Sequence, residues 1–92
     1  MLIYKSAYKW EQGICLGEVL DFPGTVSFGH TLDEARSNLA SGLRDMAETN
    51  VLHGEPLPLP DATCDDPLAD LQEPIYLCLQ AGQNVSLHVA AP

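Results

Sequence analysis

Carboxylates are the most numerous side chains of this chain that could do chemistry, since the sequence holds 13 acids and four bases. Two pairs lie close together, Glu18 with Asp21 and Asp33 with Glu34. Carboxylates that converge on Mg²⁺ can support phosphodiester hydrolysis. Asp33 and Glu34, however, stand where a helix is predicted to start, and acids there stabilise the first turn, while acids elsewhere are mostly solvated. We therefore expect neither a metal site nor catalytic carboxylates.

The other candidate catalytic groups are scattered. No serine lies in a G-x-S-x-G elbow, and the glycines do not form a phosphate-binding loop. The three histidines are far apart in the sequence: His30, His53 and His88. The three cysteines are Cys15, Cys64 and Cys78. Their odd number and the absence of C-x-x-C spacing argue against a disulfide framework or a zinc site. The sequence thus predicts a protein that is not an enzyme, needs no cofactor and suits the reducing cytoplasm.

The charge balance favours a protein partner over a nucleic acid. The formal net charge is -9 at pH 7. Proteins that bind nucleic acids neutralise phosphates with Lys and Arg, so we expect no direct nucleic-acid binding. The charge suits either solubility alone or attraction to a basic protein. With 92 residues the chain should form a single domain, and the stretch from Pro74 to Pro92 is too polar to cross a membrane.

The first third of the chain predicts three strands. Leu2–Trp10 and Ile14–Leu20 are rich in β-favouring residues, and the polar Glu11-Gln12-Gly13 between them suits a hairpin loop. Pro23 and Gly24 then occupy the two central positions of a type II turn, and a short third strand, Val26–Phe28, ends at Gly29. Because both faces of the second strand are largely apolar, we expect both to be covered, one of them by a second subunit or by the C-terminal segment.

A long helix is predicted from about residue 32 to about 52. Thr31 and Glu34 form a capping box, in which each side chain can bond the other residue's amide. Gly54 is a suitable stop signal. Between them, apolar residues recur at helical spacing and form one stripe: Leu32, Ala35, Leu39, Leu43, Met46 and Ala47.

The last third of the chain begins with an acidic linker. Residues 61–73 contain five acids and no base: Asp61, Asp65, Asp66, Asp70 and Glu73. Ile75–Leu79 and Val85–Val89 are expected to be strands. The resulting fold class is α+β, with element order β-β-β-α-β(-β) and a mainly antiparallel sheet under one helix.

Four elements of the sequence together resemble the HicB-like antitoxin family. They are Asp21-Phe22-Pro23-Gly24, the Gly29–Ala35 stretch, the long helix and Gly54–Pro60. These resemble the family pattern of D-L-P-G, then G-D-T-x-x-E-A, then a helix, then G-x-x-x-P-x-P. Leu20 and His30 depart from it, standing where the family usually has Pro and Asp. The tail after Pro60 has no base and no clear helix pair, unlike the DNA-binding segment that many members carry.

The resemblance implies a fold similar to a reduced RNase H fold and an antitoxin that blocks a small, basic, mRNA-cleaving toxin of the HicA type. Residues 1–60 would form the family-like core, 61–73 the linker and 74–92 a C-terminal strand region. We expect the five linker acids to contact the toxin, with Pro23, Gly24, Gly29, Thr31, Glu34 and Gly54 as structural residues. A homo-oligomer, most simply a dimer, is also expected. The alternative is a stand-alone homo-oligomeric domain without a toxin; a residual nuclease is disfavoured because the first strand has no acid.

Overall fold

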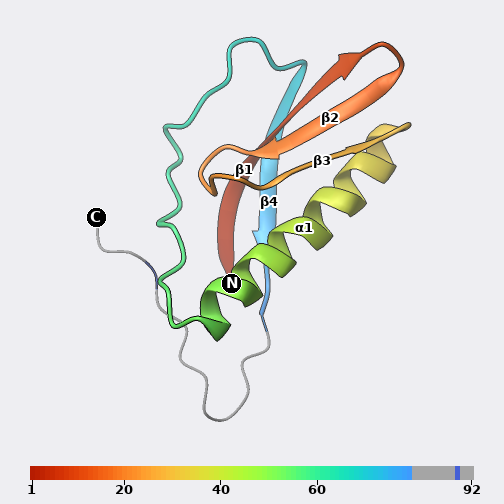
Figure 1. Cartoon of the computed structure of the whole chain (residues 1–92). Helices are drawn as coiled ribbons and strands as arrows, with labels where there is room; N and C mark the ends of the chain where they lie inside the picture. The colour runs from red at the N-terminus through yellow and green to blue at the C-terminus, as the bar shows by residue number, and fades with distance from the viewer. Residues whose placement is uncertain (80–88, 90–92) are drawn as a thin grey trace.

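The computed structural model describes residues 1–79 and 89. Its four strands form one sheet in the order β3-β2-β1-β4, and every neighbouring pair is antiparallel. One long helix covers one face of this sheet (Figure 1). The α+β class and the antiparallel sheet predicted from the sequence are therefore confirmed. The elements are β1 (Leu2–Glu11), β2 (Ile14–Val19), β3 (Val26–Gly29), α1 (Leu32–Leu52) and β4 (Leu71–Leu77).

The core lies between the sheet and α1. Alternate residues of β1 point to the helix because side chains alternate between the faces of a strand, which buries Tyr4 and Tyr8. From β2, Cys15 and Val19 are buried on the same face. Leu32 and Met46 of the predicted helical stripe pack at the margin of the core. The other four residues of the stripe are fully buried: Ala35, Leu39, Leu43 and Ala47.

The two turns that join the first three strands have the expected geometry. Gln12 and Gly13 both have positive φ, 51° and 80°, as a two-residue type I′ hairpin requires. In the second turn Gly24 has a φ of 87°, and the Thr25 amide donates to the Phe22 carbonyl at 3.3 Å. The predicted type II turn at Pro23 and Gly24 is therefore present.

The approach of β3 to the start of α1 depends on Gly29. A Cβ atom at Gly29 would lie 2.5 Å from the backbone nitrogen of Ala35, so no other residue fits without moving the helix. Thr31 then caps α1, since its hydroxyl accepts the Glu34 amide at 3.1 Å. The return half of the predicted capping box is not formed. The Glu34 carboxylate instead lies 3.5 Å from Nδ1 of His30.

The helix ends in a Schellman motif. Gly54 has a φ of 68°, its amide donates to the Val51 carbonyl, and the Glu55 amide donates to the Asn50 carbonyl. The predicted stop at Gly54 is thus confirmed, and the helix bounds of 32 to 52 agree with the sequence.

The chain after the helix differs from the predicted linker, because it runs along the sheet (Figure 1) and its last residues are part of a strand. Residues 55–70, which we call the return segment, run the length of the sheet to the end at which β4 starts (Figure 1). This long return lets β4 pair antiparallel with β1. β4 begins at Leu71 instead of Ile75 and ends at Leu77 instead of Leu79, so the last residues of the predicted linker are strand. Pro74 is tolerated because β4 is an edge strand.

The second predicted C-terminal strand, Val85–Val89, falls mostly on residues outside those described. Of that stretch, the structure places Val89, which forms an isolated parallel bridge with Leu57.

Two glycine substitutions test the packing of β3 on α1. Gly29→Ala should destabilise the protein by about 1–3 kcal/mol, because the new methyl group overlaps the helix backbone. Gly42→Ala, in the middle of α1, meets nothing within 4 Å and should stabilise the protein by roughly 1 kcal/mol through helix propensity. Urea denaturation measures both. Equal midpoints for the two variants would contradict the close approach.

Candidate functional site

The sheet face that points away from α1, called the outer face below, is partly covered by the return segment. The Lys5 ammonium donates to the carbonyls of Ala62 at 3.0 Å and Cys64 at 2.7 Å. Further along β1, the Lys9 ammonium lies 3.4 Å from the Asp66 carboxylate. Two of the four bases are thus used within the chain to hold this segment.

Asp21 fixes the start of the return segment. One of its carboxylate oxygens accepts the backbone amide of Lys5 at 2.8 Å, and the other accepts that of Asp61 at 2.9 Å. Nearby, the Tyr4 hydroxyl donates to the Pro58 carbonyl at 2.7 Å. Sequence reasoning missed this role of Asp21. The signal was an acid directly before the Pro-Gly turn with no helix to cap.

The buried Tyr4 phenol is a consequence of this arrangement. Burial, together with the nearby negative charge of Asp21, raises the pKa of Tyr4 to about 12. The neutral phenol is therefore favoured in the folded protein, where it bonds the return segment.

The five acids predicted to bind a partner do not form one cluster, and each has a partner within the chain. Asp61 accepts the amide and the hydroxyl of Thr63, and these bonds lower its pKa. Asp70 accepts the Trp10 amide at 2.8 Å. Asp65 accepts the Gln72 side-chain amide at 2.8 Å, and Asp66 pairs with Lys9.

Glu73 lies apart from the other four acids, on the face that α1 covers. Its two carboxylate oxygens accept Nε and one terminal nitrogen of Arg36 at 2.7 and 2.9 Å. This two-bond pair ties the helix to the edge strand β4. Hydrogen bonds and charge from Glu73 raise the pKa of the Arg36 guanidinium above its ordinary value.

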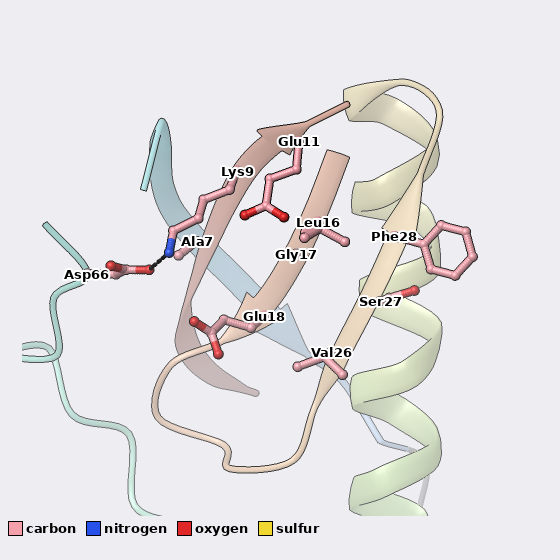
Figure 2. A pocket seen from close by; sticks show the side chains of 10 residues that line it. All are labelled: Ala7, Lys9, Glu11, Leu16, Gly17, Glu18, Val26, Ser27, Phe28 and Asp66. Atoms are coloured by element: carbon pink, nitrogen blue, oxygen red, sulfur yellow. Dashed lines mark ion pairs between the residues drawn. The ribbon is translucent and has the colours of Figure 1, made fainter. Parts of the chain in front are cut away.

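The uncovered part of the outer face forms a hollow of about 570 Å³. Figure 2 shows it from close by, with the Lys9–Asp66 pair at one side and Phe28 and Val26 at the other. Both faces of β2 were expected to be covered. Within the described residues the face toward α1 is covered, whereas Leu16 on the outer face remains exposed. We call this the outer-face hollow; its lining is Ala7, Lys9, Glu11, Leu16, Gly17, Glu18, Val26, Ser27, Phe28 and Asp66.

Residues 1–79 and 89 contain no group of three or more His, Cys, Asp or Glu side chains placed to hold a metal ion. In the same part of the chain, no helix is both long and apolar enough to cross a membrane.

Comparison with known proteins identifies the fold. No protein-family model and no curated protein sequence matches the chain. The N-terminal domain of Burkholderia pseudomallei antitoxin HicB matches with a TM-score of 0.69 and 22% identity, over 85% of this chain and 100% of that one. A structure of the Burkholderia pseudomallei antitoxin HicB matches with a TM-score of 0.71 and 22% identity, over 100% of this chain and 76% of that one. The chain therefore has the fold of the HicB N-terminal domain, as the sequence resemblance predicted.

The bonds to Asp21 can be tested by one isosteric change. Asp21→Asn replaces one carboxylate oxygen with an NH2 group, which cannot accept a hydrogen bond, and should cost about 1–3 kcal/mol because a partly buried backbone amide loses its partner. Urea denaturation measures the loss, and hydrogen exchange should accelerate at the backbone amide of Lys5 or Asp61, whichever faces the NH2 group. The exposed Asp45→Asn is the matched control, with an effect within about 0.5 kcal/mol. Equal stability of the two variants would show that Asp21 does not hold the start of the return segment in place.

Alkaline titration tests the buried Tyr4. The pKa of Tyr4 in the folded protein, about 12, exceeds the ordinary value of about 10, so the folded state holds the phenol proton more tightly than the unfolded state does. The stability from this linkage is complete below pH 10 and is lost as the pH rises through about 12. Tyr4→Phe should therefore lose less stability than the wild type between these two values. Denaturation at several pH values measures this, and parallel curves for both proteins would show that Tyr4 is not the responsible group.

Proposed function

We propose that this chain is a HicB-like antitoxin that binds and neutralises a small, basic, mRNA-cleaving toxin of the HicA type in the cytoplasm. The observation that carries the proposal is the structural likeness to antitoxin HicB over the full length of the chain. The four sequence elements described above add to it, because they resemble the pattern of the same family in the same order.

The electrostatics of the folded chain support a basic partner. Lys5, Lys9 and Arg36 are engaged with carbonyls or carboxylates of the chain itself. The formal net charge is -9, so the field outside the protein is that of an acidic surface. Such a field attracts a basic protein and accelerates the encounter, while it repels nucleic acid.

Neutralisation of this kind requires only that the antitoxin occupy the toxin's RNA surface, and no bond in the partner is made or broken. The acids of the return segment contribute to attraction even though they have internal partners, because Asp61, Asp65 and Asp70 are exposed. We propose that they steer the toxin during the encounter, which raises the association rate more than the final affinity.

Co-expression tests the proposed function. The proposal predicts that a small basic protein is encoded next to this chain. That protein should arrest growth when expressed alone, and growth should recover when this chain is added. The two purified proteins should elute together in size-exclusion chromatography. An acidic protein of similar size and charge but a different fold is the control and should not restore growth, because charge alone does not give a matching surface.

Persistent growth arrest in cells that contain both proteins would contradict the proposal. RNA cleavage by the purified chain with Mg²⁺ would instead indicate the residual nuclease.

A further inference from the structure

We propose that the outer-face hollow is the docking surface for a protein segment that presents a Lys or Arg beside an apolar side chain. This inference rests on the proposed function and names the part of the surface that the basic toxin occupies. Among the five acids of residues 61–73, Asp66 lines the hollow, so the inference moves the main contact away from the other four.

The floor of the hollow is apolar and open. Leu16, Val26 and Phe28 are 39, 68 and 55% exposed. Leu16 and Phe28 stand directly opposite each other on β2 and β3, so their side chains share one patch on the outer face. Contiguous exposed apolar side chains mark binding surfaces, and buried aromatic residues are enriched at the centres of interfaces.

Carboxylates lie beside this floor. Glu11 on β1 and Glu18 on β2 line the hollow, whereas its one base, Lys9, is paired with Asp66 (Figure 2). No base among residues 1–79 and 89 forms an ion pair with Glu11 or Glu18. The hollow therefore carries three acids and one base, which is a net negative site with an apolar floor.

A Lys or Arg of a partner matches both properties. Its methylene stem can pack on Leu16 and Phe28 while its charged head reaches Glu11 or Glu18. An arginine can form two charge-assisted hydrogen bonds to one carboxylate there.

A second copy of this chain fits less well. A two-fold axis through the hollow would bring Glu11 and Glu18 of one copy against the same residues of the other, and like charges in an interface are unfavourable. The edge of β3 is also partly closed, since the Asn38 side chain donates to the Phe28 carbonyl at 2.8 Å. The charge of the hollow therefore favours a basic partner over self-association at this site.

The experiment measures binding of the toxin from the co-expression test to immobilised variants of the full chain. Phe28→Ser should weaken binding roughly tenfold or more, mainly through faster dissociation. The double change Glu11→Lys and Glu18→Lys should weaken it by a similar factor and flatten the salt dependence of the association rate.

Matched controls carry the same changes elsewhere. Leu68→Ser removes a side chain that is 76% exposed on the return segment, and Asp45→Lys with Glu48→Lys reverses two exposed charges on α1. Both controls should bind within about threefold of the wild type. Circular dichroism and denaturation confirm that each variant is folded.

Of three possible results, the first two would overturn the inference, and the third calls for a different probe. If the hollow variants bind like the wild type, the toxin docks elsewhere and the proposed function still stands. If the wild type is a dimer that Phe28→Ser dissociates, the hollow is covered by a second copy. If the toxin does not bind at all, the proposed function fails, and the hollow is tested by nuclear magnetic resonance with a synthetic Lys-Leu peptide as the probe.

In that last case, saturable shifts confined to Leu16, Gly17, Val26 and Phe28 would retain the hollow as a site for basic-apolar segments. Shifts spread over the surface, or none, would overturn it.

Discussion

The Asp21 carboxylate holds together two parts of the chain that lie 40 residues apart. It accepts one amide from β1 and one from the start of the return segment. Hydrogen bonds to a charged group contribute about 1.5–3 kcal/mol each, whereas ordering the backbone costs about 1–2 kcal/mol per residue, so this contact offsets part of the entropy lost when the segment is ordered. With the segment held at this point, the chain can run back along the sheet and enter β4 antiparallel to β1.

The return segment also determines which charges remain available for a partner. Lys5 and Lys9 lie on the outer face of β1, and both are drawn toward the segment, one by carbonyl groups and the other by Asp66. On the opposite face, Glu73 takes up Arg36. These contacts leave an outer surface on which Glu11 and Glu18 flank exposed apolar residues. The same contacts that stabilise the fold therefore give this surface its acidic and apolar character.

The acids of residues 61–73 show why composition is a weak guide to a binding site. A run of acids without a base suggests an exposed linker, yet every one of these carboxylates has a partner in the folded chain. Their partners come from β1, α1 or the segment itself, and the distant ones cannot be recognised from the local sequence. Leu16 and Phe28 misled in the opposite direction: apolar residues in a strand normally indicate a core, yet both are exposed on the outer face.

The sequence by itself determined the local structure. Backbone geometry and short-range hydrogen bonds set the turn at Pro23 and Gly24, the cap at Thr31 and the helix end at Gly54, and residue type alone indicates them. The spacing of apolar residues likewise identified the buried stripe of α1, and the order of motifs indicated the fold. Tertiary structure decided what depends on residues far apart in the chain: the start of β4 at Leu71, the role of Asp21 and the partners of the acids. It also decided that Leu16 and Phe28 face outward, since one helix can cover only one face of a sheet.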